Sequence, residues 1–210
     1  GGCDETLDRI RAVGGEGEAK VCHIGKMEQI EGIYQYVDKT HGKLDILVNN
    51  AASNPYYGHI LDTDLGSFKK TLEVNLQGYF FMSVYAGRRM REAKAGAILN
   101  VASINGVSPG DKQGVYSMTK AGIINMTKAF ARECGSLGIR VNSLIPGLTR
   151  TRFAQALHDD DDFMAMQIPN TPLARGGEPS EMAAAALYLL SDAASYTTGA
   201  SIVVDGGYLA

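Results

Sequence analysis

A serine, a tyrosine and a lysine within residues 100–120 carry the groups needed to hold a carbonyl oxygen and give it a proton. Ser103 ends a short apolar run, Tyr116 follows thirteen residues later, and Lys120 completes a Tyr-x-x-x-Lys pattern. Residues four apart on a helix share one face, with about 5–6 Å between their Cβ atoms. An ammonium beside a phenol favours the phenolate, and a serine hydroxyl can bond the substrate oxygen. The pattern indicates proton transfer at a carbonyl or secondary alcohol, which needs a hydride partner.

Tyr-x-x-x-Lys alone is weak evidence, since tyrosine fills cores and lysine is common on surfaces. The serine upstream strengthens it if a strand and a helix bring the three together. Continuous apolar runs that alternate with helical patterns predict buried strands at 19–24, 44–50, 97–103, 139–145 and 201–207. Such runs are typical of a parallel sheet covered on both faces. The sequence therefore predicts a doubly wound α/β fold of the Rossmann type, as one domain over residues 1–210.

Distinctive residues follow three of these strands at their carboxyl ends, where ligands bind in such sheets. Asn49 and Asn50 follow one strand, Ser103 the next, and Pro146 and Gly147 the third. One edge of the sheet should therefore hold the site.

The composition argues against several classes of binding partner. With 20 basic and 23 acidic residues scattered along the chain, no basic patch for nucleic acid or an anionic membrane is evident. The longest apolar run, 183–190, is too short for a membrane span. The three cysteines lack a Cys-x-x-Cys spacing, which favours reduced thiols and a cytoplasmic location. We expect no nucleic acid partner, no membrane partner and no metal.

The chain resembles the short-chain dehydrogenase/reductase (SDR) family, similar to its carbonyl reductases, over residues 3–208. Five motifs in the family's order carry the resemblance: Asn49-Asn50-Ala51-Ala52, Asn75 within VNLQG, Ser103, Tyr116-x-x-x-Lys120, and Pro146-Gly147-Leu148-Thr149-Arg150-Thr151.

The resemblance implies an oxidoreductase that moves a hydride between NAD or NADP and a small carbonyl or alcohol. In that family's pattern Tyr116 is the general acid/base, Lys120 lowers its pKa and holds the nicotinamide ribose, and Ser103 orients the substrate oxygen. Asn75 would complete a proton relay through water. From the residues alone, an Asn75 that only bonds backbone carbonyls is nearly as good an explanation.

The resemblance also implies the cofactor contacts. Pro146, Gly147, Thr149 and Thr151 would border the nicotinamide, although the first two also suit a plain turn. Asn50, Ala51 and Ala52 would approach the adenosine half.

The family's acidic residue at the adenine is replaced here by Cys22-His23-Ile24. Either His23 bonds the base edge, or only the Ile24 backbone does.

The chain also differs from the family's pattern at its beginning. The family's first strand, glycine-rich phosphate loop, first helix and second strand should precede Gly1, and we expect that this sequence lacks these roughly 45–50 residues. The residue that separates NAD from NADP lies in that part, so the sequence does not discriminate between them.

Two alternatives stay open. One is a Rossmann-like binding or scaffold protein without a cofactor site. The other is a sugar-nucleotide epimerase or dehydratase, which shares Tyr-x-x-x-Lys but is usually longer.

Other segments suggest weaker features. The acidic run at 158–162 favours a solvated loop or helix start over a metal site. Residues 149–178 correspond to the family's mobile lid over the substrate. Small residues from Ala121 to Ala131, together with the C-terminal strand, resemble surfaces with which the family forms homotetramers.

Overall fold

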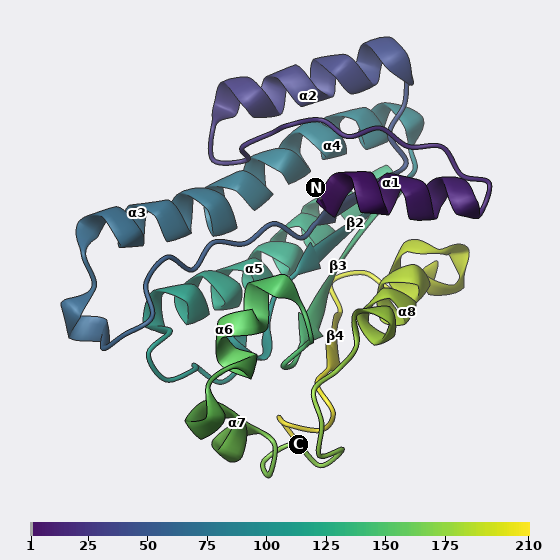
Figure 1. Cartoon of the computed structure of the whole chain (residues 1–210). Coiled ribbons are helices and arrows are strands. Elements are labelled where there is room, and N and C mark those ends of the chain that lie inside the picture. The colour runs from purple at the N-terminus through teal and green to yellow at the C-terminus, as the bar shows by residue number, and fades with distance from the viewer. Residues whose placement is uncertain (1) are drawn as a thin grey trace.

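A parallel four-stranded sheet forms the centre of the molecule (Figure 1). The computed structural model describes residues 2–210. Its strands are β1 (Ile46–Asn49), β2 (Gly96–Val101), β3 (Ile139–Pro146) and β4 (Ser201–Val204), which lie side by side in chain order. All three pairings are parallel. The predicted α/β fold with a parallel sheet is therefore confirmed.

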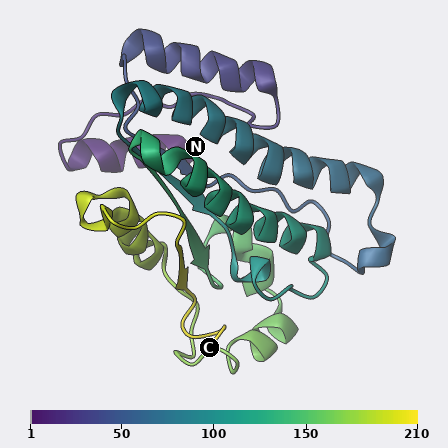
Figure 2. The same cartoon turned by 180° about the vertical axis from the view of Figure 1, so that it is seen from behind.

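Helices cover the sheet in layers. The helices α4 (Tyr79–Ala93) and α5 (Gly114–Cys134) pack on one face, and α2 (Met27–Thr40) packs on the outer side of α4. Seen from behind, α4 and α5 lie in front of the strands (Figure 2). The helix α8 (Pro179–Leu190) packs on the opposite face, against β2, β3 and β4.

Burial along the strands reflects these layers. Residues 97–100 of β2 are all buried, because helices cover both faces of that strand. In β1 burial alternates: Leu47 and Asn49 are buried, whereas Ile46 and Val48 are each 46% exposed. The face of β1 that looks away from α4 is therefore open among the described residues.

Buried amides join β1 to its neighbours within this apolar frame. Asn49 and Asn100 are cross-strand partners, and the Asn49 Nδ2 atom donates to Asn100 Oδ1 at 2.9 Å and to Ser83 Oγ at 3.0 Å. Asn100 Nδ2 in turn donates to Thr127 Oγ1 on α5 at 3.0 Å. These side chains satisfy one another inside the core, as buried polar groups must.

The strand predicted at 19–24 is wrong. The helix α1 (Gly2–Ala12) is followed by Gly14 in a left-handed turn with φ of 79°, and the chain then runs without a strand to α2. Val21 is fully exposed. An apolar run becomes a strand only when a partner takes up its backbone hydrogen bonds, and none of the described strands lies beside this segment.

The segment between β1 and β2 contains an irregular helix. The sequence predicts helical structure from about Ser67 to Arg91, and the structure has α3 (Leu65–Leu72), a π-helical turn at Glu73–Gly78, and α4. Single π-helical turns are frequent at functional sites. Asn75 lies in this turn.

The lid segment predicted at 149–178 contains two short helices, α6 (Gln155–His158) and α7 (Asp161–Gln167). Among residues 2–210, no helix combines the length and the apolarity that crossing a bilayer requires.

Candidate active site

The helix α5 positions Tyr116 and Lys120 on its buried face, one turn apart. Tyr116 is 8% exposed and Lys120 is 2% exposed. The Lys120 Nζ atom lies 5.4 Å from the centroid of the Tyr116 ring and 5.6 Å from that of the Tyr79 ring. It also donates to the carbonyl oxygen of Val101 at 2.9 Å, at the end of β2. The amine is thus held between the catalytic candidate and the sheet.

Ser103 reaches the same place from the carboxyl end of β2. Its hydroxyl accepts a hydrogen bond from the Asn105 N–H at 3.1 Å, which begins a 3-10 turn at Ile104–Gly106. Gly106 presses this turn on α5 so closely that a Cβ atom would lie 2.7 Å from the carbonyl carbon of Lys120. Only glycine permits this approach, which brings Ser103 to Tyr116.

Burial dominates the ionisation of these groups. It raises the pKa of Tyr116 to about 12, although a hydrogen bond with the Ser103 hydroxyl acts in the opposite direction. It also lowers the pKa of Lys120 to about 8. That Lys120 lowers the pKa of Tyr116 stays a prediction. At neutral pH the phenol therefore carries its proton and Lys120 is mostly charged.

Asn75 forms hydrogen bonds to the loop after β1 and to the helix α5. Its Oδ1 atom accepts from the Ser53 N–H at 2.8 Å, and its Nδ2 atom donates to the Ser53 carbonyl oxygen and to Thr119 Oγ1, both at 3.0 Å. The side chain is fully buried and fully engaged. As in the simpler interpretation of Asn75, the side chain bonds backbone groups. These groups belong to the loop that follows β1. Its role in a proton relay stays a prediction.

Thr119 is a residue that the sequence analysis missed. It is 1% exposed, and its hydroxyl donates to the carbonyl oxygen of Tyr116 at 2.7 Å while it accepts from Asn75. Thr119 thus connects Asn75 to the backbone of the tyrosine. A polar residue one place before the lysine of Tyr-x-x-x-Lys was the available signal.

The turn after β3 lies at the same edge of the sheet. The Gly147 N–H donates to the carbonyl oxygen of Val204 at 2.9 Å, and a Cβ at this position would lie 2.7 Å from the Asp205 Cα atom. Thr149 pairs with Gly177 in a parallel bridge, and its hydroxyl donates to the Gly147 carbonyl oxygen at 3.0 Å. Pro146 and Thr151 begin and end this turn, so the predicted nicotinamide residues lie within one stretch of six residues.

The residues predicted for the adenosine half are more dispersed. Asn50, Ala51 and Ala52 follow the carboxyl end of β1 and are exposed or half-buried. The His23 ring is already engaged: Nδ1 accepts from the Gly25 N–H at 3.1 Å, and Nε2 contacts Lys70 Nζ. The side chain of Ile24 packs in the cluster around Tyr79. Cofactor contacts by His23 and Ile24 stay predictions.

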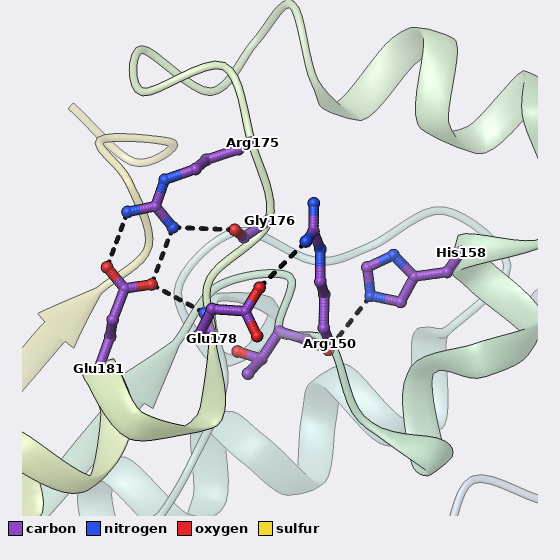
Figure 3. Close-up of polar contacts among 7 residues, drawn as sticks. Arg150, His158, Arg175, Gly176, Glu178 and Glu181 are labelled. Atoms are coloured by element: carbon purple, nitrogen blue, oxygen red, sulfur yellow. Dashed lines mark hydrogen bonds and ion pairs between the residues drawn. The ribbon is translucent and has the colours of Figure 1, made fainter.

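The predicted lid segment, residues 149–178, contacts Tyr116 through Phe153. The ring of Phe153 lies 6.3 Å from the Tyr116 ring, centroid to centroid, and is 58% exposed. Three residues before Phe153, Arg150 forms an ion pair with Glu178 (Figure 3). Its N–H also donates to the Gly177 carbonyl oxygen. In the acidic run, Asp160 caps α7 by accepting from the Phe163 N–H at 2.9 Å, which agrees with a helix start.

These groups are suited to holding a carbonyl oxygen and protonating it. A hydroxyl, a protonated phenol and an amine converge at the carboxyl edge of a parallel sheet, beside a turn that offers two threonine hydroxyls. Amine, hydroxyl and amide donors are also the types that bind ribose and carboxamide groups. The donor set therefore fits the nicotinamide half of NAD(P), for which Lys120 and residues 146–151 stay the predicted contacts.

Comparisons with known proteins agree with this arrangement. A family model described as enoyl-(acyl carrier protein) reductase matches residues 3–209. Dehydrogenase/reductase SDR family member 4 of Oryctolagus cuniculus is 35% identical over 204 residues, which cover 97% of this chain and 78% of that protein.

Solved structures are similar as well. A gluconate 5-dehydrogenase from Burkholderia cenocepacia, in complex with NADP and tartrate, aligns with a TM-score of 0.92 at 27% identity, covering 98% of this chain and 80% of that one. A short-chain type dehydrogenase/reductase from Mycobacterium marinum aligns with a TM-score of 0.90 at 35% identity, covering 96% and 79%.

Proposed function

Because this chain belongs to the short-chain dehydrogenase/reductase family and is an NAD(P)-dependent oxidoreductase acting on CH–OH groups, we propose that Tyr116 exchanges the proton on the substrate oxygen. The observation that supports this role best is the burial of its phenol beside Lys120 and Ser103. Its substrate is a small molecule with a carbonyl or secondary alcohol group.

The residues act on the substrate oxygen in both directions. The nicotinamide cofactor supplies or accepts the hydride at the carbonyl carbon when it is bound. In reduction, Ser103 donates a hydrogen bond to the carbonyl oxygen, and Tyr116 transfers its proton to that oxygen as negative charge develops there. The Lys120 ammonium then stabilises the tyrosinate, and alcohol oxidation reverses these steps.

Replacing the phenol tests this proposal. Tyr116→Phe should lower kcat by about 100-fold or more, because positioned general acids contribute about 10²–10⁴ to the rate, while the melting temperature changes little. Tyr196→Phe, at a fully exposed tyrosine, is the matched control and should keep full activity. Full turnover by Tyr116→Phe would refute the role of Tyr116.

The other site residues have supporting roles in the same proposal. Pro146, Gly147, Thr149 and Thr151 border the nicotinamide, Lys120 holds its ribose, and Asn50, Ala51 and Ala52 approach the adenosine half. Substitutions at Thr151 should therefore raise KM for the cofactor more than KM for the substrate.

We further propose that residues 1–210 act as one domain in a cytoplasmic homotetramer. Exposed apolar side chains on α8 and β4 support the assembly, since Leu187 is 71% exposed and Val203 is 44% exposed. Sedimentation at about the mass of a single chain would contradict it.

A further inference from the structure

A cavity on the lid is lined by basic and neutral polar side chains. It has a volume of about 380 Å³, and its lining residues are Arg150, Thr151, Arg152, Gln155 and His158. No aspartate or glutamate among the described residues belongs to that lining. Two guanidinium groups and an imidazole around one space favour an anionic occupant, because arginine binds carboxylate and phosphate with paired N–H groups.

The wall at Arg150 is built rigidly. The Arg150 N–H donates to the Gly177 carbonyl oxygen at 2.9 Å, and the Gly177 N–H donates to the Leu148 carbonyl oxygen at 2.8 Å. The Arg150 guanidinium pairs with Glu178 at 3.0 Å (Figure 3). Arg150 is therefore fixed in place and partly neutralised.

Glu178 is itself held by the start of α8. Its backbone N–H donates to Glu181 at 2.8 Å, and Glu181 pairs with Arg175 through two hydrogen bonds of 2.8 and 2.7 Å. These bonds lower the pKa of Glu181 to about 2. Both carboxylates of this network are thus engaged outside the cavity.

The other side of the cavity has spare hydrogen-bonding capacity. Arg152 has an 88% exposed side chain, and its ion pair with Glu5 is long, at 3.9 Å. His158 uses Nε2 to bond the Thr149 carbonyl oxygen at 3.2 Å, so this nitrogen is the donor. Among the described residues no hydrogen bond engages Nδ1, which donates to an oxyanion when the ring is protonated on both nitrogens.

Residues that line the cavity are neighbours in sequence of residues at the catalytic site. Thr151 belongs both to its lining and to the predicted nicotinamide turn. Phe153, next to Arg152, is the residue that packs near Tyr116. Arg152 and Phe153 belong to one 3-10 turn, Arg152–Ala154, so the cavity and the ring that faces Tyr116 at 6.3 Å are carried by neighbouring residues of that turn.

We propose that Arg150, Arg152 and His158 form an oxyanion subsite for the carboxylate or phosphate group of a molecule bound at the active site. This inference rests on the proposed function, because it places that molecule at Tyr116. The anion belongs either to the substrate, which would then be a small oxo or hydroxy acid or a phosphorylated carbonyl compound, or to the cofactor's phosphates.

Titration with inorganic phosphate, followed by NMR, tests the subsite without turnover. Arg152→Gln should weaken phosphate binding about tenfold or more, since it removes a charge-assisted hydrogen bond. Glu178→Gln should strengthen binding severalfold, because it releases Arg150 from a competing carboxylate. Arg91→Gln, at an exposed arginine paired with Glu92, is the matched control and should have no effect.

Unchanged phosphate affinity in Arg152→Gln, or no binding by the unmodified protein, overturns the subsite. Tyr116→Phe should bind phosphate normally, so that loss of the catalytic role and loss of the subsite are separable results.

Kinetics then identify the source of the anion. If the substrate supplies it, Arg152→Gln lowers kcat/KM about tenfold for a 2-oxo acid but not for its methyl ester. If the cofactor supplies it, the variant raises KM for NADP or NAD with both compounds. Unchanged values in both comparisons would also overturn the subsite.

Discussion

Hydrogen bonds through a hydroxyl and an amide hold the backbone of Tyr116 in place. The carbonyl oxygen of Tyr116 accepts the Thr119 hydroxyl at 2.7 Å, and Thr119 accepts Asn75 Nδ2 at 3.0 Å. The same asparagine bonds both backbone groups of Ser53. The position of the tyrosine therefore depends on the loop that follows β1.

Thr119→Val tests this dependence. It leaves one N–H of the Asn75 amide without an acceptor in the core, since the other still donates to the Ser53 carbonyl oxygen, and this should cost about 1–3 kcal/mol of stability. Since Tyr116 also loses its anchor, we expect kcat to fall roughly five- to tenfold, equivalent to about 1–1.4 kcal/mol, with little change in KM for the substrate. Steady-state kinetics with chemical denaturation of the same samples measures both effects.

Thr119→Ser is the conservative control for that variant. It keeps the hydroxyl and should restore most of kcat. If Thr119→Ser were as slow as Thr119→Val, the hydroxyl and its hydrogen bonds would not explain the loss.

At the scale of elements, the approach of the 3-10 turn to α5 decides where Ser103 lies. A Cβ at Gly106 would lie 2.7 and 2.8 Å from the carbonyl carbon and oxygen of Lys120. These are backbone atoms of a buried helix, so the turn has to move instead.

Gly106→Ala should therefore destabilise the protein by about 1–3 kcal/mol, as overpacking does, and should also lower kcat by displacing Ser103. Gly87→Ala is the contrasting variant, because nothing lies within 4 Å of its Cβ position in α4. There the higher helix propensity of alanine should stabilise the protein by up to about 1 kcal/mol. Equal effects of the two substitutions in urea unfolding would contradict this.

The elements also separate what the sequence can predict from what it cannot. The strands β1 to β4 and the helix α5 follow from apolar runs and glycine stops, because these patterns reflect burial directly. The run at 19–24 has the same pattern, yet strand formation depends on a partner elsewhere in the fold. The π-helical turn at Asn75 and the contact of Gly106 with Lys120 depend on packing between distant segments, which no local pattern encodes.

The site was predictable to a similar degree. Ser103, Tyr116 and Lys120 lie together because a strand end and a helical spacing placed them on one edge. The hydrogen-bond partners of Thr119 and of the lid arginines could not be predicted in this way. Their partners, Asn75 and Glu178, are 44 and 28 residues away.

At the scale of the whole molecule, a buried amine in the core makes stability depend on pH. Burial lowers the pKa of Lys120 to about 8, from 10.5 in its ordinary state. Between these values the unfolded chain binds more protons than the folded one, so stability rises with pH across this range. Above about pH 9 the raised pKa values of Cys22 and Cys134 act in the opposite direction, and above about pH 10 so do those of the buried tyrosines.

Lys120→Met should remove this contribution. We expect the free energy of unfolding of the unmodified protein to rise relative to that of Lys120→Met as pH increases from 8 to 9. Urea unfolding of both proteins at pH 7, 8 and 9 measures the difference. Parallel pH dependence in the two proteins would mean that the ammonium is not desolvated in the fold.

The Asn49–Asn100 pair has a consequence for how the chain avoids misfolding. The apolar neighbours on β1 and β2 tolerate a sliding of one strand along the other, because one aliphatic side chain can replace another. A slip of β1 by one residue would turn Asn49 to the opposite face, away from Asn100 and Ser83, at about 1–3 kcal/mol for each group left unsatisfied. These two asparagines therefore select one alignment of the strands among several that hydrophobicity alone would accept.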